Sequence, residues 1–121
     1  MAKFNINSQR IKDYIEDMAK QARKISFYPQ AISRKLNIPI DLVMIELTNL
    51  MNEGIVDLKY EIRCSDDLNI IKTVDNYENI IHTELYCDEC GNYVEITNSN
   101  IYPIYNINEE YKKYIKSKKK I

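Results

Sequence analysis

The fold is decided by residues 28–64, which read YPQAISRKLNIPIDLVMIELTNLMNEGIVDLKYEIRC. Apolar residues recur there at steps of three and four, a spacing that places side chains on one face of a helix. Pro39 interrupts the pattern, because proline pushes the preceding residue out of the helical region but fits the first turn of the next helix. We therefore expect a short helix, a tight turn and a longer helix. The expected inward residues are Ile32, Leu36, Ile38, Val43, Leu47 and Leu50.

The longer helix is expected to end at Gly54 and to be followed by a strand. Glycine readily adopts the left-handed conformation that closes many helices. Beyond it, apolar residues alternate from Ile55 to Ile62, which is typical of a strand. Two helices and a strand in this order resemble a winged helix-turn-helix domain. Such domains bind DNA in some proteins and contact other proteins in others.

Two further helices are expected near the ends of the chain. Ser8 is a suitable N-cap for a helix whose apolar stripe runs to Ile25. Asn108 is a suitable N-cap for a short helix, and the acidic Glu109 and Glu110 would favour its first turn. Just before this short helix, apolar and polar residues alternate within residues 101–107, which indicates a returning strand or an edge segment.

The cysteines point to a metal site rather than to disulfides. An odd number, three, argues against a disulfide framework and favours a reducing cytoplasm. Cys87 and Cys90 stand in the turn CDECG between two strand-like runs, residues 80–86 and 93–96. In such a turn both sulfurs can face one metal ion, and Gly91 allows the backbone to fold around them.

The second half of this metal site is altered. A zinc ribbon has another CxxC about 15–20 residues upstream, whereas this chain has Cys64-Ser-Asp-Asp67, with nineteen residues between Asp67 and Cys87. Residues 60–97 therefore resemble a zinc ribbon in which an aspartate replaces one cysteine. One structural zinc would be bound by Cys64, Asp67, Cys87 and Cys90, or His82 would supply the fourth ligand instead. In the remaining alternative the site is empty and the lobe depends on apolar packing of Leu68, Ile70, Ile71, Val74, Ile80, Ile81 and Leu85.

Charge is strongly segregated along the chain. Residues 1–35 carry eight basic and three acidic residues, and residues 36–110 carry three basic and fifteen acidic residues, a net charge of −12. Residues 111–121 add six lysines and no acid. A protein partner with a basic face would complement the acidic middle.

The longer helix of residues 28–64 favours protein contact over DNA reading. No basic residue stands between Lys35 and Lys59, and carboxylates there would be repelled by DNA phosphates. The expected partner-binding residues are Ile40, Asp41, Met44, Ile45 and Thr48. The basic residues that would hold DNA in the alternative reading are Arg10, Arg23, Lys24, Arg34 and Lys35.

Winged helices followed by zinc ribbons occur in general transcription factor E and in small bacterial and phage proteins, and the resemblance covers residues 8–105. It implies an α+β fold in three parts: a winged helix-turn-helix at 1–60, a small β zinc-ribbon-like lobe at 61–107, and a short helix with a basic tail at 108–121. The expected function is a non-enzymatic adaptor or regulatory subunit of a bacterial or phage multi-component system. The alternative is a DNA-binding transcriptional regulator.

An enzyme is not expected, because no nucleophile–base or carboxylate pair stands out. A membrane span is not expected either, since the chain has no run of about 20 apolar residues, and the localisation expected is cytoplasmic. The apolar side chains on the longer helix would equally suit a homodimer, so both a foreign partner and a second copy stay open.

Overall fold

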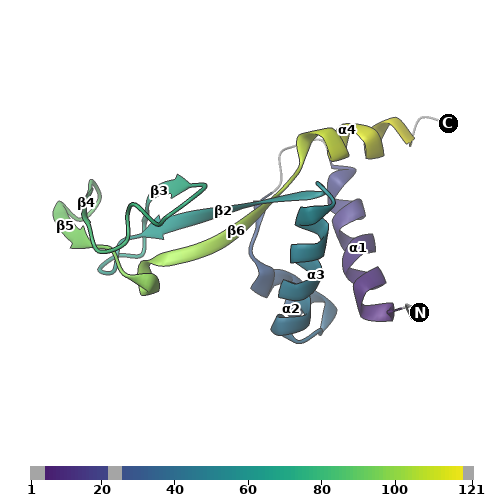
Figure 1. Cartoon of the computed structure of the whole chain (residues 1–121), viewed down its shortest axis with the longest axis horizontal. Coiled ribbons are helices and arrows are strands. Elements are labelled where there is room, and N and C mark those ends of the chain that lie inside the picture. The colour runs from purple at the N-terminus through teal and green to yellow at the C-terminus, as the bar shows by residue number, and fades with distance from the viewer. Residues whose placement is uncertain (1–4, 22–25, 119–121) are drawn as a thin grey trace. The chain divides into compact units, whose positions relative to one another are not determined.

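The computed structural model describes residues 5–21 and 26–118 and has a mixed α+β fold (Figure 1). Within these residues the helices are α1 (Ile6–Ala19), α2 (Pro29–Leu36), α3 (Ile40–Asn52), α4 (Glu109–Lys118) and the short 3-10 helix η1 (Asn98–Asn100). The strands are β1 (Ser26–Phe27), β2 (Val56–Arg63), β3 (Ile70–Val74), β4 (Glu84–Cys87), β5 (Asn92–Glu95) and β6 (Ile101–Ile107). No helix of the described ranges has the length and apolar character to cross a membrane.

The strands form two sheets. One has the order β1-β6-β2-β3, in which β1 pairs antiparallel with β6 and β2 with β3; the other is the antiparallel hairpin β4–β5. The chain groups into two compact units, one made of residues 1–57 and 105–121 and the other of residues 58–104. Helix α4 thus belongs to the same unit as the first three helices. The division at residues 60 and 107 stays a prediction.

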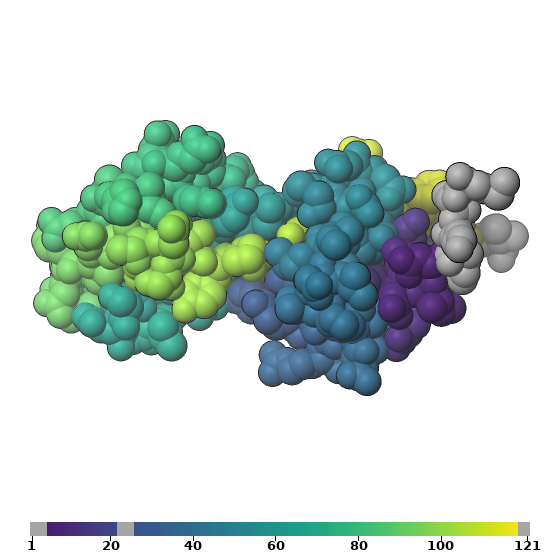
Figure 2. Space-filling model, turned by 60° about the horizontal axis from the view of Figure 1, so that its bottom comes forward, coloured from purple at the N-terminus to yellow at the C-terminus, as the bar shows by residue number. Residues whose placement is uncertain are grey.

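The helical unit buries the face that the sequence indicates. Ile32, Ile38, Val43, Leu47 and Leu50 are buried, while Leu36 is only half-buried. Helix α1 adds further buried side chains and packs against α2, α3 and α4. Figure 2 shows this helix, in purple, beside the blue segment that carries α2 and α3.

The predicted interruption before Pro39 and the predicted helix end at Gly54 are both confirmed. Asn37 adopts a left-handed φ of 55° between α2 and α3, and Gly54, at φ 79°, follows α3. The side chain of Asn108 accepts hydrogen bonds from the backbone N–H groups of Glu110 and Tyr111, so it caps α4 as expected. Residues 119–121 of the predicted basic tail lie outside the described residues.

Helix α1 differs from the prediction at both ends. Its N-cap is Asn5, whose Oδ1 accepts from the N–H groups of Asn7 and Ser8, so the prediction of Ser8 as the cap is wrong. The helix ends at Ala19 instead of continuing toward Ile25, and residues 22–25 lie outside the described residues. Ser8 is occupied elsewhere, because its hydroxyl donates to Glu46 Oε1 of α3 at 2.7 Å.

Ser8→Ala is expected to lower the free energy of unfolding by about 1–3 kcal/mol, because Glu46 is buried and its other carboxylate oxygen already lacks a hydrogen-bond partner within the described residues. Urea unfolding measures the change. Thr48→Ala is the matched control. Among the described residues this exposed hydroxyl bonds only its own helix, at the Met44 carbonyl, so its loss should stay within about 0.5 kcal/mol. Equal effects of the two variants would contradict the role of Ser8.

The other unit has its own small core. Its buried residues are Ile62, Cys64, Cys87, Val94 and Ile96, with Ile71, Val74, Tyr77, Ile80, Leu85, Cys90 and Ile101 packed against them. Four residues of the predicted packing set are therefore confirmed, but Leu68 and Ile70 are exposed and Ile81 is half-buried outside this cluster.

Two strand predictions in and near this unit need correction. Residues 80–83 are a turn in which the Tyr77 carbonyl accepts from the N–H groups of Ile80 and Ile81, so the strand begins only at Glu84. Of the two alternatives for residues 101–107, the returning strand is confirmed as β6, and the edge segment is wrong because β6 lies between β1 and β2. Pro103 lies outside the part of β6 that pairs with β1, which consists of Tyr105 and Asn106.

Candidate metal centre

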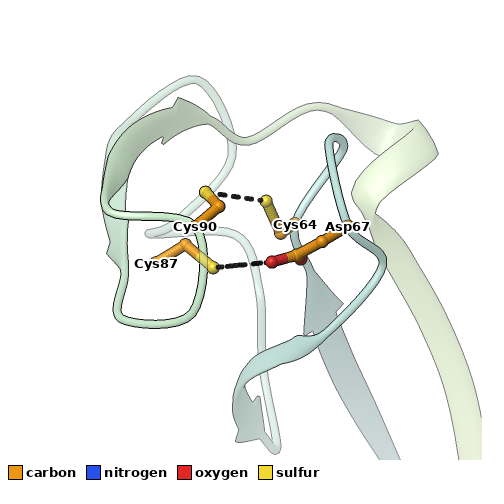
Figure 3. Close-up of side chains that lie close together, drawn as sticks. All are labelled: Cys64, Asp67, Cys87 and Cys90. Atoms are coloured by element: carbon orange, nitrogen blue, oxygen red, sulfur yellow. Dashed lines mark hydrogen bonds between the residues drawn. The ribbon is translucent and has the colours of Figure 1, made fainter.

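Two turns bring together Cys64, Asp67, Cys87 and Cys90 (Figure 3). Cys64 follows β2 and Asp67 lies in the next turn, whereas Cys87 ends β4 and Cys90 lies in the hairpin turn. One ligand atom from each residue lies within 4.8 Å of all the others, so the four are close enough to hold a metal ion. The ligand set predicted from the sequence spacing is thus assembled in space.

Two of the distances between the ligand atoms are close to the edges of a zinc coordination tetrahedron. Cys64 Sγ lies 3.6 Å from Cys90 Sγ, and Cys87 Sγ lies 3.8 Å from Asp67 Oδ2. Zinc–sulfur bonds of about 2.3 Å at tetrahedral angles place two sulfurs about 3.8 Å apart, and a sulfur and an oxygen about 3.5 Å apart. The donor set of three sulfurs and one carboxylate therefore fits Zn²⁺ in size and in ligand type.

The two turns have the same backbone design. In the first, the N–H of Leu68 donates to the carbonyl of Cys64 at 2.9 Å; in the second, the N–H of Gly91 donates to the carbonyl of Cys87 at 2.8 Å. The closing residue is left-handed in both turns, with φ 62° at Leu68 and 77° at Gly91. The first turn also directs the N–H of Asp66 at Cys64 Sγ, at 3.4 Å. The Asp67 turn is therefore a structural copy of the CxxCG turn.

This equivalence predicts that Leu68→Gly stabilises the protein. A left-handed φ costs a residue with a Cβ about 1–2 kcal/mol, and the Leu68 side chain is 56% exposed, so little packing is lost. The free energy of unfolding is expected to rise by about 0.5–1 kcal/mol in urea titrations. The matched control is Gly91→Ala, which should destabilise by a similar amount although a Cβ there would meet no atom within 4 Å. A destabilised Leu68→Gly variant would contradict the equivalence.

The surroundings act on the ionisation of these ligands in opposite directions. The N–H of Asp67 has the largest influence on Cys64 and lowers the pKa of this thiol, but burial and the side chains of Cys90 and Asp67 raise it to about 11. The N–H of Asn69 is the main cause of the lowered pKa of the Asp67 carboxyl. A divalent cation among the four residues would favour the thiolate of Cys64 and displace its proton.

His82 is not a member of this group of four. Its side chain is exposed, its φ is 67°, and its backbone N–H donates to the Ile96 carbonyl at 2.7 Å. Asp67 is therefore the geometrically favoured fourth ligand, and His82 serves as a turn residue.

The predicted partner-binding residues lie on α3. Ile40, Asp41, Ile45 and Thr48 are exposed, and Met44 is half-buried. Leu42, which the sequence reasoning missed, is 41% exposed and lies one turn before Ile45, which is 60% exposed. Its exposure was predictable from the helical spacing, because Leu42 does not lie on the face formed by the buried residues Val43, Leu47 and Leu50.

The basic residues of the DNA-binding alternative are distributed differently. Arg34 and Lys35 are exposed in the last turn of α2. Arg10 donates a hydrogen bond from its guanidinium to the Leu36 carbonyl at 2.6 Å, so it helps to close the C-terminus of α2. Arg23 and Lys24 lie outside the described residues.

No family model matches the chain, and comparisons with curated proteins and with solved structures give no match either. The function must therefore be inferred from the residues of the chain itself.

Proposed function

We propose that the chain is a non-enzymatic adaptor module in which a winged helix-turn-helix carries a zinc-ribbon-like lobe stabilised by one structural zinc. The zinc proposal rests on the close approach of Cys64, Asp67, Cys87 and Cys90, whose ligand atoms lie within 4.8 Å of one another. All four ligands come from the protein, which is the arrangement of structural zinc, whereas a catalytic zinc keeps one position open for water or substrate. Zinc in this lobe would stabilise the fold and would not activate a substrate.

The adaptor function is proposed from the exposed apolar residues of α3. Ile40, Leu42 and Ile45 are large, exposed and borne on one helix. Leu42 and Ile45 lie three residues apart and so share one side of the helix, and exposed apolar side chains that adjoin in this way are typical of surfaces that contact another protein. The neighbouring Asp41 and the acidic middle of the chain favour a partner whose contact surface is basic. We call Ile40, Asp41, Leu42, Met44, Ile45 and Thr48 the α3 surface.

A photo-crosslinking amino acid at position 45 tests this proposal in the cells from which the chain derives. We expect one discrete cross-linked protein, and we expect it to disappear when Leu42→Asp is added, because a carboxylate beside Ile45 opposes burial of the apolar side chains there. The control places the same crosslinker at Tyr114, an equally exposed residue of α4. Diffuse cross-links, or the same product at both positions, would overturn the adaptor proposal.

The DNA-binding alternative rests on the exposed Arg34 and Lys35. If it holds, the protein binds a labelled duplex with an affinity that falls steeply with salt, and Arg34→Ala or Lys35→Ala weakens that binding. For the adaptor we expect only weak binding, with a Kd above about 10⁻⁴ M at physiological salt, unchanged by either substitution. Fluorescence anisotropy between 50 and 200 mM salt distinguishes the two.

A further inference from the structure

The hairpin β4–β5 presents an aromatic pair on its outer face. Tyr86 and Tyr93 are direct cross-strand partners, and their rings pack edge to face with centroids 5.3 Å apart. Both are exposed, Tyr93 to 70%. The alternate residues Leu85 and Val94 face the other way, toward the small core. The hairpin is therefore anchored by one face while its tyrosines remain free to contact a ligand.

Two carboxylates lie directly beside this tyrosine pair. Glu84 and Glu95 are the next cross-strand pair, two residues along each strand from the tyrosines, and so share their face. Both are exposed, and neither takes part in the ion pairs formed among the described residues. Like charges directly opposite each other destabilise a hairpin, and a cation bound between them would relieve this repulsion.

The chemistry of this face favours one kind of occupant. Residues 58–104 hold nine acidic and three basic residues, so the surrounding field attracts cations and repels nucleic-acid phosphates. A guanidinium is planar, stacks on aromatic rings and pairs with carboxylates through two parallel hydrogen bonds. The chain already contains one such contact, since the Arg63 guanidinium lies 5.4 Å from the ring centroid of Tyr102.

We propose that the outer face of β4–β5 binds an arginine side chain in a basic segment of a protein partner. Tyr86 and Tyr93 provide the aromatic surface for the guanidinium plane, and Glu84 and Glu95 provide the opposing charge. This surface shares no residue with the α3 surface, so either can fail without the other. The proposal needs no zinc-dependent step.

The test uses the full chain with zinc in the buffer and a fluorescein-labelled peptide of twelve residues, three of them arginine and the rest glycine and serine. Tyr93→Ala is expected to weaken binding at least tenfold. The double variant Glu84→Gln, Glu95→Gln should weaken it similarly and flatten its salt dependence. Replacing arginine by lysine in the peptide should cost about fivefold, because an ammonium cannot stack or form a bidentate pair.

The controls are Tyr114→Ala and Glu109→Gln, exposed residues of α4, which should stay within twofold of the unmodified chain. Loss of folding does not explain a loss of binding by the glutamine double variant, because removing a like-charge pair should not lower its thermal midpoint. The proposal is overturned by several outcomes: no binding above that of a glycine–serine peptide, equal binding of the lysine peptide, or hairpin variants that bind normally. Two other results also overturn it. In the first, Tyr93→Ala leaves peptide binding intact but abolishes binding of a single-stranded oligonucleotide; in the second, it leaves peptide binding intact but abolishes self-association of the chain.

Discussion

Replacing Cys87 by serine is expected to remove the bound zinc and to destabilise the β lobe by several kcal/mol. Zinc binding by structural sites of this type supplies about 10–16 kcal/mol in peptides, and that energy is folding energy because the unfolded chain has no preformed site. Cys87 is buried and is one of the two candidate ligands from the hairpin. A serine hydroxyl is not a zinc ligand of comparable strength. Loss even of an outer-shell group costs 10–100-fold in affinity, so loss of a direct ligand should cost more.

Native mass spectrometry and urea unfolding, each with and without a chelator, measure this effect. The unmodified chain should carry one zinc and lose stability on chelation, whereas Cys87→Ser should carry none and be insensitive to the chelator. At zinc concentrations a hundredfold above Kd, linkage predicts a gain of about 2.7 kcal/mol for the unmodified chain alone. This comparison separates metal loss from lost packing, since packing losses would be equal with and without chelator. A chain that binds no zinc and ignores the chelator would reduce the three cysteines to packing residues.

The ligand set was predictable because its information is local. Each pair of ligands is separated by two residues, and a turn of that length closes on itself with one backbone hydrogen bond. What the sequence did not reveal is the left-handed Leu68, because a leucine gives no sign of this conformation. The correspondence of the Asp67 and Cys90 turns was predicted, whereas the left-handed conformation that Leu68 shares with Gly91 is a finding of the structure.

The errors in the fold have a common cause, which is long-range contact. Asn5 and Ser8 are both good caps by residue type; Asn5 caps the helix, and the Ser8 hydroxyl instead bonds Glu46, 38 positions away. Residues 80–83 show apolar character that suits a strand, yet Ile80 reaches the small core from a turn. In both cases the local sequence is compatible with two structures, and contacts with distant parts of the chain accompany the one that forms.

The tyrosine pair illustrates the same limit on the surface. Tyr86 and Tyr93 are seven positions apart, and only the strand register shows that they are direct partners with Glu84 and Glu95 beside them. Alternation along each strand was readable from the sequence, but the pairing between strands was not. Surfaces built from two strands are thus less predictable than a pair of candidate ligands that one turn supplies.

Asp67→Cys is expected to change the stability of the chain in opposite directions with and without zinc. The aspartate has two roles: it offers an oxygen to the metal site, and its Oδ1 accepts the N–H of Asn69 at 3.0 Å. A cysteine would lose that hydrogen bond, which costs about 1 kcal/mol in the metal-free protein. With zinc present it would complete a four-cysteine set, the most usual ligand class for a structural zinc, and we expect zinc affinity to rise at least tenfold.

Three further variants test whether Asp67, and not a neighbouring residue, is the fourth zinc ligand. Asp67→Asn keeps the size and an acceptor for Asn69 but removes the charge, so zinc affinity should fall while metal-free stability changes little. Asp66→Asn, at an exposed neighbour outside the group of four, is the matched control and should leave zinc affinity unchanged. His82→Asn should also leave it unchanged; a loss of zinc in that variant, with none in Asp67→Asn, would make the histidine the fourth ligand. Chelator competition ranks the four affinities, and the crossover would show that the aspartate supports both the turn and the metal.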